Sequence, residues 1–302
     1  MNWREAVRNM CCLVQGVIGR SPRAASLYLR TIGWLGKPFP DNLWKRRVHN
    51  ALGWGDWAGV TLPPRTVELG GSIAVKLVPH SGEFDFAALL FRRLPYEAEV
   101  FDWLVGREYD TVIEIGANVG VFTLFLARRY PQARIYAFEP SVAAYRRLLD
   151  NLAANREERA TTFNCAVSDS TAFIDFFEPS GHLTNGSLDP AFAAHFSINV
   201  SSRRVLAIDA QALAPLISGR TLVKLDVEGA EPRVLRAMGA LLRERRPDLL
   251  VEVLENTAAA LNGLDFLLDG SYSIFSLADS GPMPVTRFEA GRFRDFALVA
   301  RR

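Results

Sequence analysis

Cysteine is scarce in this chain of 302 residues, which contains only Cys11, Cys12 and Cys165. Their number is odd, and no two of them have the CxxC spacing that is typical of metal sites. The composition therefore argues against a fold held together by disulfide bonds, and it predicts a reducing compartment.

The sequence also lacks a long apolar run near its N-terminus. The longest uncharged stretch there is residues 9–19, whereas a helix that spans a membrane needs about 20 apolar residues. There is no convincing secretory signal. With 49% hydrophobic and 23% charged residues, the chain has the composition of an ordinary globular protein. We therefore expect a cytoplasmic protein.

The net charge is small but unevenly distributed. The total is +2, whereas residues 1–47 contain nine Lys and Arg against Glu5 and Asp41, a balance of +7 that leaves −5 for the other residues. This basic segment could contact an anionic membrane surface or a protein partner, or it could be a helical cap with a solvated basic face. Its large apolar residues include Trp3, Leu27, Leu29, Ile32, Trp34 and Leu35.

Three regions differ in their patterns. Residues 1–60 mix helical stretches with Gly and Pro, and predict a helical N-terminal extension. Residues 61–109 predict a preface of two short strands around Gly70-Gly71 and one helix. Over residues 110–302, short apolar strands alternate with helical stretches. This alternation predicts an α/β domain with a mostly parallel sheet and helices on both faces.

One long insertion interrupts the alternation at residues 178–200. Ordered loops of this length often act as lids or binding loops, although a surface loop without a role is the alternative. We expect Asn185, Gly186 and Ser187 to contact a substrate.

A glycine-rich turn follows the first strand of the α/β region, in VIEIGANVG. Glu114 precedes Gly116, Asn118 and Gly120, where glycines allow a sharp turn and the next helix offers free N–H groups. Asn118 occupies the place of the second glycine of GxGxxG, so the turn is a poor match to a dinucleotide fingerprint.

Acidic residues follow the next strands. Glu139 ends the second strand in IYAFEPS, where an acid can accept hydrogen bonds from the two hydroxyls of a ribose. Asp169 follows a third predicted strand in FNCAVSDS, where it could bind an adenine amino group or simply form a turn.

A fourth strand end, KLDVEGAE, completes a recognisable set. The motifs EIGANVG, FEP, AVSD and KLDVEGAE have the order and spacing of the FkbM-type S-adenosylmethionine-dependent methyltransferases, and the chain resembles this family over roughly residues 95–255. The resemblance implies a Rossmann-like, seven-stranded, mostly parallel sheet whose last strand is antiparallel. It also implies an S-adenosylmethionine site at the glycine turn and methylation of a hydroxyl.

The resemblance also assigns roles to individual residues. Glu139, with Pro140 of the same motif, would hold the ribose, Asp169 would hold the adenine, and Asp226 would lie near the sulfonium. The methionine part and the turn of the cofactor site would involve Glu114, Gly116, Asn118 and Gly120. Glu114 is a departure, because the family commonly has Asp at this position.

A hydroxyl acceptor needs a general base. Asp226 and Glu228 are two residues apart, and a close carboxylate pair raises the pKa of one member. One of them is our candidate base, and His182 and His195 in the insertion are alternatives. Together with Glu252 the pair could instead bind a divalent cation, but this spacing is not diagnostic and we do not favour a metal.

Two neighbours of this pair have structural interpretations. Glu231 precedes Pro232 and is expected to open a helix. Lys224 lies inside the apolar run and is expected to extend its ammonium to solvent or to pair with an acid such as Glu252, and we favour the ion pair.

The sequence thus predicts an O-methyltransferase for a hydroxyl of a sugar, a glycan or a small-molecule metabolite. The alternatives are a nicotinamide-dependent oxidoreductase, which the missing GxGxxG disfavours, and a non-catalytic cofactor-binding scaffold. Nucleic acid is disfavoured as a substrate, because residues 48–302 are acidic and lack the Asn/Asp-Pro-Pro-aromatic motif of base-directed enzymes.

Overall fold

The chain forms two compact units in the computed structural model. One unit comprises residues 1–67 and 74–96, and the other comprises residues 68–73 and 97–302. The predicted start of the main domain at residue 110 lies within the second unit, which also contains α5 (Ala98–Val105). The described residues are 17–18, 21–35, 62–80, 97–180 and 185–301.

The first unit contains a helix of the predicted extension, α2 (Pro22–Leu35). Ser21 precedes it, and the Ser21 hydroxyl accepts a hydrogen bond from the Ala24 N–H at 3.4 Å, as expected of an N-terminal cap. The rest of the predicted extension, apart from residues 17, 18 and 62–64, lies outside the described residues. Within the described residues, every helix is too short or too polar to cross a membrane.

The predicted strand pair around Gly70-Gly71 is present. It consists of β1 (Arg65–Leu69) and β2 (Ile73–Leu77). Both glycines have positive φ, 52° and 73°, which is the backbone conformation that glycine adopts most easily.

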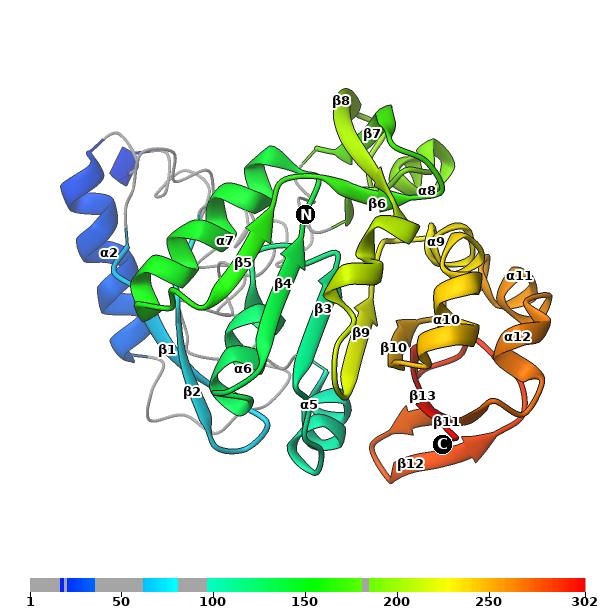
Figure 1. Cartoon of the computed structure of the whole chain (residues 1–302). Coiled ribbons are helices and arrows are strands. Elements are labelled where there is room, and N and C mark those ends of the chain that lie inside the picture. Colours follow the sequence, from blue (N-terminus) through cyan, green and yellow to red (C-terminus); the bar gives the residue numbers. More distant parts are fainter. Residues whose placement is uncertain (1–16, 19–20, 36–61, 81–96, 181–184, 302) are drawn as a thin grey trace. The chain divides into compact units, whose positions relative to one another are not determined.

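The second unit is built on a large sheet, shown in Figure 1. Its eight strands among the described residues are, in spatial order, β12 (Gly281–Val285), β11 (Tyr272–Ala278), β13 (Asp295–Ala300), β10 (Asp248–Glu252), β9 (Thr221–Leu225), β3 (Thr111–Ile115), β4 (Arg134–Phe138) and β5 (Ala160–Phe163).

The strand order reverses between β3 and β9, which pair in parallel. From β3 the chain passes through α6 (Val121–Arg129) to β4 and through α7 (Val142–Asn155) to β5. From β9 it moves the other way, through α9 (Glu231–Ala237) and α10 (Gly239–Arg245), to β10. In open α/β sheets, ligands bind beyond the carboxyl ends of the strands at such a reversal.

The far end of the sheet is antiparallel. The last strand, β13, lies between β10 and β11 and is antiparallel to both, as predicted. The predicted count of seven strands was wrong, because β12 adds an eighth at the edge. Its sequence GPMPV contains Pro282 and Pro284, which hid it from the strand pattern. Proline is tolerated there because, on an edge strand, every second N–H group points away from the sheet and forms no hydrogen bond to another strand.

A separate small sheet departs from the prediction of one strand in FNCAVSDS. The chain leaves the large sheet after β5, and β6 (Ala166–Ser168) pairs with β8 (Val200–Asp209), which also pairs with β7 (Ala172–Pro179). The described residues of the insertion at 178–200 therefore include regular secondary structure. It includes α8 (Pro190–Phe196), capped by the Asp189 carboxylate, which accepts a hydrogen bond from Ala191 N–H at 2.9 Å.

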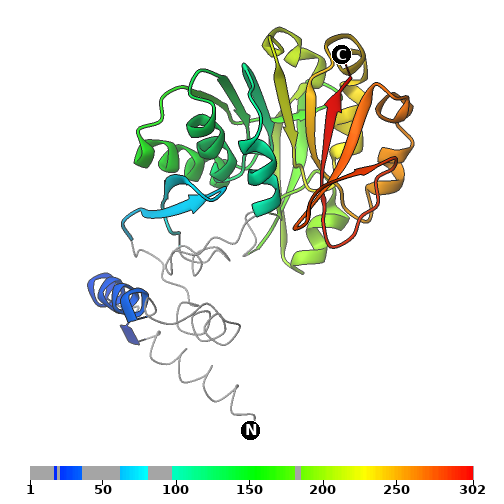
Figure 2. The same ribbon diagram turned by 90° about the horizontal axis from the view of Figure 1, so that it is seen from below.

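Helices cover both faces of the large sheet, as predicted and as Figure 2 shows from below. On one face, Phe101 of α5 packs on Phe122 and Phe125 of α6, with ring centroids 4.7 and 4.5 Å apart. The other face packs on apolar residues of η2 (Ala210–Leu216), α9, α10, α11 (Ala258–Asn262) and α12 (Asp265–Leu268).

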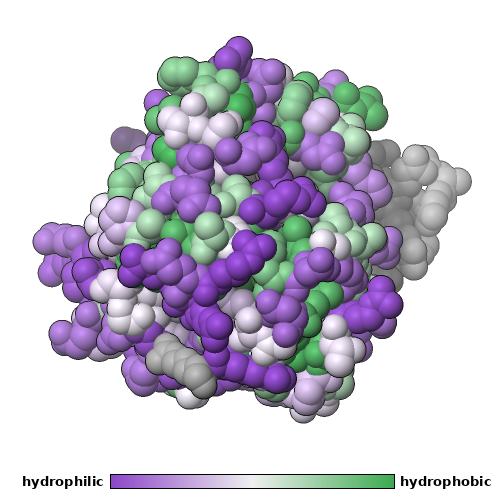
Figure 3. Space-filling model, turned by 45° about the vertical axis from the view of Figure 1, so that its right-hand side comes forward, coloured by the Kyte–Doolittle hydropathy of each residue, from purple (hydrophilic) through white to green (hydrophobic). Residues whose placement is uncertain are grey.

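The buried and exposed surfaces agree with this layering. All five residues of β3 and of β9 are buried, as expected for central parallel strands covered on both faces. The outer surface is mixed: on the side shown in Figure 3, apolar residues lie in small patches among hydrophilic ones.

The turn after β3 touches the end of β9. The Asp226 N–H donates to the Ile115 carbonyl oxygen at 3.0 Å. A Cβ atom on Gly116, whose φ is +90°, would lie 1.7 Å from the carbonyl oxygen of Asp226. Only glycine therefore fits where the two central strand ends meet.

Replacing Gly116 with alanine should destabilise the second unit more than the same change at Gly270. Both glycines have φ of +90°, so alanine meets the same backbone strain, about 1–2 kcal/mol. A Cβ at Gly270 would meet no described heavy atom within 4 Å. We expect Gly116→Ala to lower the free energy of unfolding, measured in urea, by at least ~2 kcal/mol more than Gly270→Ala. Equal losses would contradict the close approach.

Candidate functional site

The candidate site lies where β3, β4, β9 and β10 end. The glycine turn after β3 has three residues with positive φ: Gly116 at 90°, Asn118 at 50° and Gly120 at 84°. The N–H groups of Gly116 and Ala117 donate to the carbonyl oxygen of Phe138 at 3.0 and 2.9 Å, which ties the turn to β4. Gly120 caps α6, where a Cβ would lie 2.4 Å from Leu148 of α7.

Glu139 joins the end of β4 to the glycine turn. Its carboxylate accepts hydrogen bonds from the N–H groups of Asn118 and Ser141, each at 2.8 Å. Burial raises the pKa of Glu139 to about 7, against the lowering effect of these two bonds. The next residue, Pro140, and Glu139 both use their carbonyl oxygens to accept from Asn164. The structure thus brings together Asn118, Glu139 and Pro140 as the motifs predicted.

Glu114 is enclosed beneath the turn rather than exposed in it. Its side chain is 1% exposed and accepts a hydrogen bond from the Thr123 hydroxyl of α6 at 2.6 Å. Burial raises the pKa of Glu114 to about 7, while the nearby Lys224 ammonium opposes that rise.

Asp169 has a different setting from the one predicted. It follows β6 of the small sheet rather than a strand of the large sheet. Its carboxylate pairs with Arg233 of α9 at 2.6 Å, and this hydrogen bond lowers the pKa of Asp169. Sequence reasoning missed Arg233, because the contact joins residues 64 positions apart.

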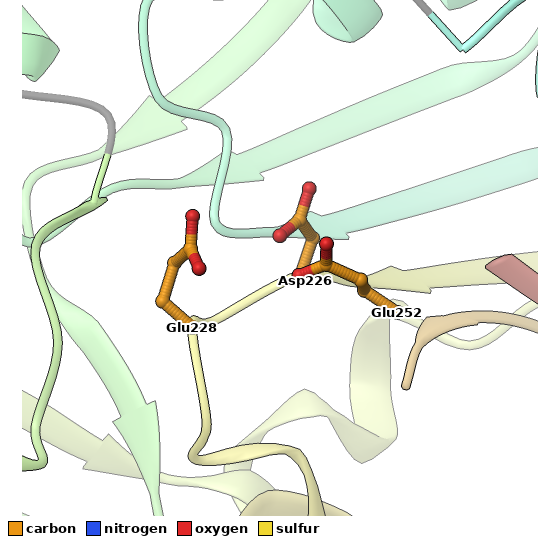
Figure 4. A group of neighbouring side chains, drawn as sticks. All are labelled: Asp226, Glu228 and Glu252. Atoms are coloured by element: carbon orange, nitrogen blue, oxygen red, sulfur yellow. The ribbon is translucent and has the colours of Figure 1, made fainter. Parts of the chain in front are cut away.

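Three carboxylates meet beyond the ends of β9 and β10. Asp226, Glu228 and Glu252 are half-buried, and each places one oxygen within 4.8 Å of the others. Figure 4 shows their side chains directed toward a shared space. Glu228 lies on a turn, where its φ is 53°. Its spacing from Asp226 had instead suggested an extended backbone. Such a set could share protons or hold a hard cation.

Two of these carboxylates have a raised pKa. Burial, followed by the negative charges of Asp226 and Glu231, raises the pKa of Glu228 to about 8. Burial raises the pKa of Glu252 to about 10, with Asp226 and Glu228 adding to the effect. Asp226 stands apart because a cation binds it directly.

That cation is Lys224, whose side chain is 3% exposed. Its ammonium donates to the Asp226 carboxylate at 2.8 Å and lies 4.3 Å from the ring centroid of Phe122. Burial opposes the charge, but Asp226, Glu97 and Glu114 together raise the pKa of Lys224. The predicted ion pair of Lys224 with an acid is confirmed, but the acid is Asp226 and not Glu252, which was named as an example. Lys224 and Asp226 are two residues apart on the same face of the chain, and this local contact prevails.

Glu252 instead faces Arg294, with 3.4 Å between a guanidinium nitrogen and a carboxylate oxygen. Asp295 lies directly opposite Glu252 in the pairing of β10 with β13, and burial raises its pKa to about 7. The pKa of Glu97, the residue before α5, is also raised, mainly by burial and next by the negative charge of Asp295. Sequence reasoning missed these residues, because no motif connects them with the strand ends.

Glu231 has the structural place that was predicted. It is the first residue of α9 and is completely buried. Its carboxylate accepts hydrogen bonds from the N–H groups of Val227 at 2.9 Å and Gly229 at 3.1 Å. It therefore supports the turn that carries Glu228.

The insertion meets the same turn. The Asn185 amide donates to the Glu228 carboxylate at 3.3 Å, and the Ser187 hydroxyl donates to the Glu228 carbonyl oxygen at 2.6 Å. Gly186 lies between them, where a Cβ would clash with Phe176. His195 is on α8 against the ring of Phe196. His182 lies outside the described residues.

Comparisons with known proteins show that this chain is similar to methyltransferases. The family model described as the methyltransferase FkbM domain matches residues 114–274, more than half of the chain. Methyltransferase 1 of Beauveria bassiana (strain ARSEF 2860) is 26% identical over 145 residues, covering 42% of this chain and 57% of that protein. The 31-O-demethyl-FK506 methyltransferase FkbM of Streptomyces tacrolimicus is 33% identical over 81 residues, covering 26% and 31%. The chain thus spans less than two thirds of these relatives.

A solved structure of another FkbM methyltransferase is also similar. It is the methyltransferase FkbM from Methylobacillus flagellatus KT, with a TM-score of 0.41 and 15% identity, covering 63% of this chain and 43% of that one. The family match includes the strand-end acids from Glu114 to Glu252. On the strength of that match, the chain belongs to the FkbM methyltransferase family.

Proposed function

We propose that this protein is an S-adenosylmethionine-dependent O-methyltransferase that acts on a hydroxyl of a sugar, a glycan or a small-molecule metabolite. Membership of the family supports methyl transfer. The observation that supports a hydroxyl acceptor is a carboxyl of raised pKa beside an ion pair: Asp226 is bound by Lys224, whereas burial and the neighbouring acids raise the pKa of Glu228 to about 8. A base of that strength suits an acceptor that must lose a proton.

A relative's name gives a second line of support. The Streptomyces tacrolimicus protein is named for the 31-O-demethyl form of its substrate, so its name places the methyl group on oxygen. The similarity covers 26% of this chain, and the acceptor here is proposed as a chemical class only.

The residues around the glycine turn suit the cofactor. The Asn118 side-chain oxygen is buried without a hydrogen-bond partner among the described residues, so it can accept from a ligand. Glu139 lies beside it with a carboxylate that suits ribose hydroxyls. In our proposal, the glycine turn and Asn118 hold the methionine part, Glu139 with Pro140 holds the ribose, and Asp169 contacts the adenine. Glu114 supports the turn from below.

S-adenosylmethionine supplies, when bound, a methyl group already activated by the sulfonium. The protein's own task is then to position the acceptor and to receive its proton. Glu228 is the proposed base, because Asn185 holds its carboxylate and Ser187 holds its main chain. Asp226 provides a fixed negative charge that favours a cationic cofactor.

A divalent cation is not part of this proposal. Two cations of the protein itself already face the carboxylate cluster, since Lys224 binds Asp226 at 2.8 Å and Arg294 faces Glu252 at 3.4 Å. The third carboxyl of the cluster, Glu228, has a pKa of about 8 and is therefore mostly protonated at neutral pH.

Replacing Glu139 with alanine should weaken S-adenosylmethionine binding by about 1–3 kcal/mol, the range for hydrogen bonds to a charged group. Glu157→Ala is the matched control, because Glu157 also accepts from the N–H two residues ahead, that of Arg159. Calorimetry should show wild-type affinity in the control. Unchanged affinity in Glu139→Ala would remove the ribose role, and binding of a nicotinamide cofactor would favour an oxidoreductase.

Replacing Glu228 with glutamine should lower turnover by ~100-fold or more and leave cofactor affinity unchanged. The base must be deprotonated, so wild-type turnover should rise with pH and level off above about 8. The measurement is release of S-adenosylhomocysteine with a panel of hydroxyl compounds, and Glu255→Gln, an exposed neighbour of Glu252, is the control.

Wild-type turnover in Glu228→Gln would move the base to Asp226, His182 or His195. A comparison with Asp226→Asn and with alanine at each histidine would then identify it. No release by the wild-type protein with any acceptor would instead favour the non-catalytic scaffold.

Removal of divalent metal should leave turnover unchanged within about twofold, because the charges that face the cluster come from Lys224 and Arg294. The test is dialysis against EDTA, followed by the same release assay with and without added Mg²⁺. Loss of turnover that Mg²⁺ restores would show that the three carboxylates bind a cation.

A further inference from the structure

Helix α2 has one face packed and the opposite face open. Ala25, Leu29 and Ile32 are buried, and Ala25 and Leu29 form a small core with Leu62. Successive residues of a helix are about 100° apart, so Leu27 and Trp34 lie on the side opposite to this core. Their side chains are 68% and 67% exposed. The helix therefore has apolar side chains on both sides, and among the described residues only one side packs into a core.

The open side is also basic. Arg23 and Arg30 are exposed and, by the same spacing, lie on the side of Leu27 and Trp34. The helix PRAASLYLRTIGWL contains no acidic residue. It belongs to the N-terminal segment, residues 1–47, in which nine Lys and Arg oppose two acids. A partner for this side must therefore offer negative charge next to an apolar layer.

A bilayer surface with anionic headgroups has both properties. Tryptophan prefers the boundary between headgroups and acyl chains, and arginine can place its charge among the headgroups while its stem lies on apolar surface. The 14 residues of α2 fit a helix that lies in this boundary rather than one that crosses it.

We propose that the open side of α2, formed by Arg23, Leu27, Arg30 and Trp34, binds the surface of an anionic lipid bilayer. This inference is independent of the proposed methyl transfer. It resolves the choice that the sequence left open for the basic segment in favour of a membrane contact.

The test is co-sedimentation of the full-length protein with two kinds of vesicle. Neutral vesicles contain phosphatidylcholine alone, and anionic vesicles contain in addition about 30% phosphatidylglycerol. The protein should bind the anionic vesicles but not the neutral ones, and about 0.5 M salt in the same assay should weaken the binding. Arg23→Gln with Arg30→Gln should weaken partitioning about 30-fold, since each arginine near the surface contributes ~1 kcal/mol. Leu27→Gln with Trp34→Gln should weaken it at least ~10-fold.

The matched control is Leu149→Gln with Phe173→Gln, which changes two exposed apolar residues of the second unit, 43% and 64% exposed. This pair should bind like the wild type. Circular dichroism would check that all variants keep their helix content. Equal binding to both kinds of vesicle, or wild-type binding by either α2 variant, would overturn the proposal. So would a failure to bind vesicles combined with α2-dependent binding to an RNA oligomer.

Discussion

The ion pair between Lys224 and Asp226 places a positive charge among the buried acidic residues of this domain. One buried ammonium lies among Asp226, Glu114 and Glu97, and it binds the first of these at 2.8 Å. Removing one partner of a buried pair leaves an uncompensated charge, which typically costs about 3–5 kcal/mol. Burial and the neighbouring Asp226 carboxylate raise the pKa of Glu228 to about 8, although Lys224 lowers it, so two neighbouring carboxyls have different surroundings.

Two kinds of structure meet at these carboxyls. The ends of the central strands hold the glycine turn, Glu139 and Asp226 rigidly, through hydrogen bonds between β3, β4 and β9. Glu228 lies on the following turn, which the insertion contacts through Asn185 and Ser187. The cofactor side of the proposed site is thus built from the sheet, and the acceptor side is built from the insertion.

The first unit adds a function of a different kind. Its helix α2 buries one side against Leu62 and leaves Leu27 and Trp34 exposed on the side that also carries Arg23 and Arg30. Burial of these two side chains would remove apolar surface from water, which is a favourable change that the isolated chain does not make. A membrane contact by this helix would bring the enzyme to acceptors at a lipid surface, whatever their chemistry.

The sequence by itself determined the features that depend on neighbours along the chain. Strand periodicity, the glycines at 116 and 120 and the acids at the strand ends predicted a parallel sheet with acidic residues gathered at one edge, because parallel strands end at one edge. Only the tertiary structure decided the features that depend on distant residues. These include the edge strand with Pro282 and Pro284, the transfer of the chain from β5 to β6, and the contact of Asp169 with Arg233. Burial and charge pairing are properties of assembled surfaces, so the pKa of Glu228 and the partner of Glu252 could not be predicted from spacing alone.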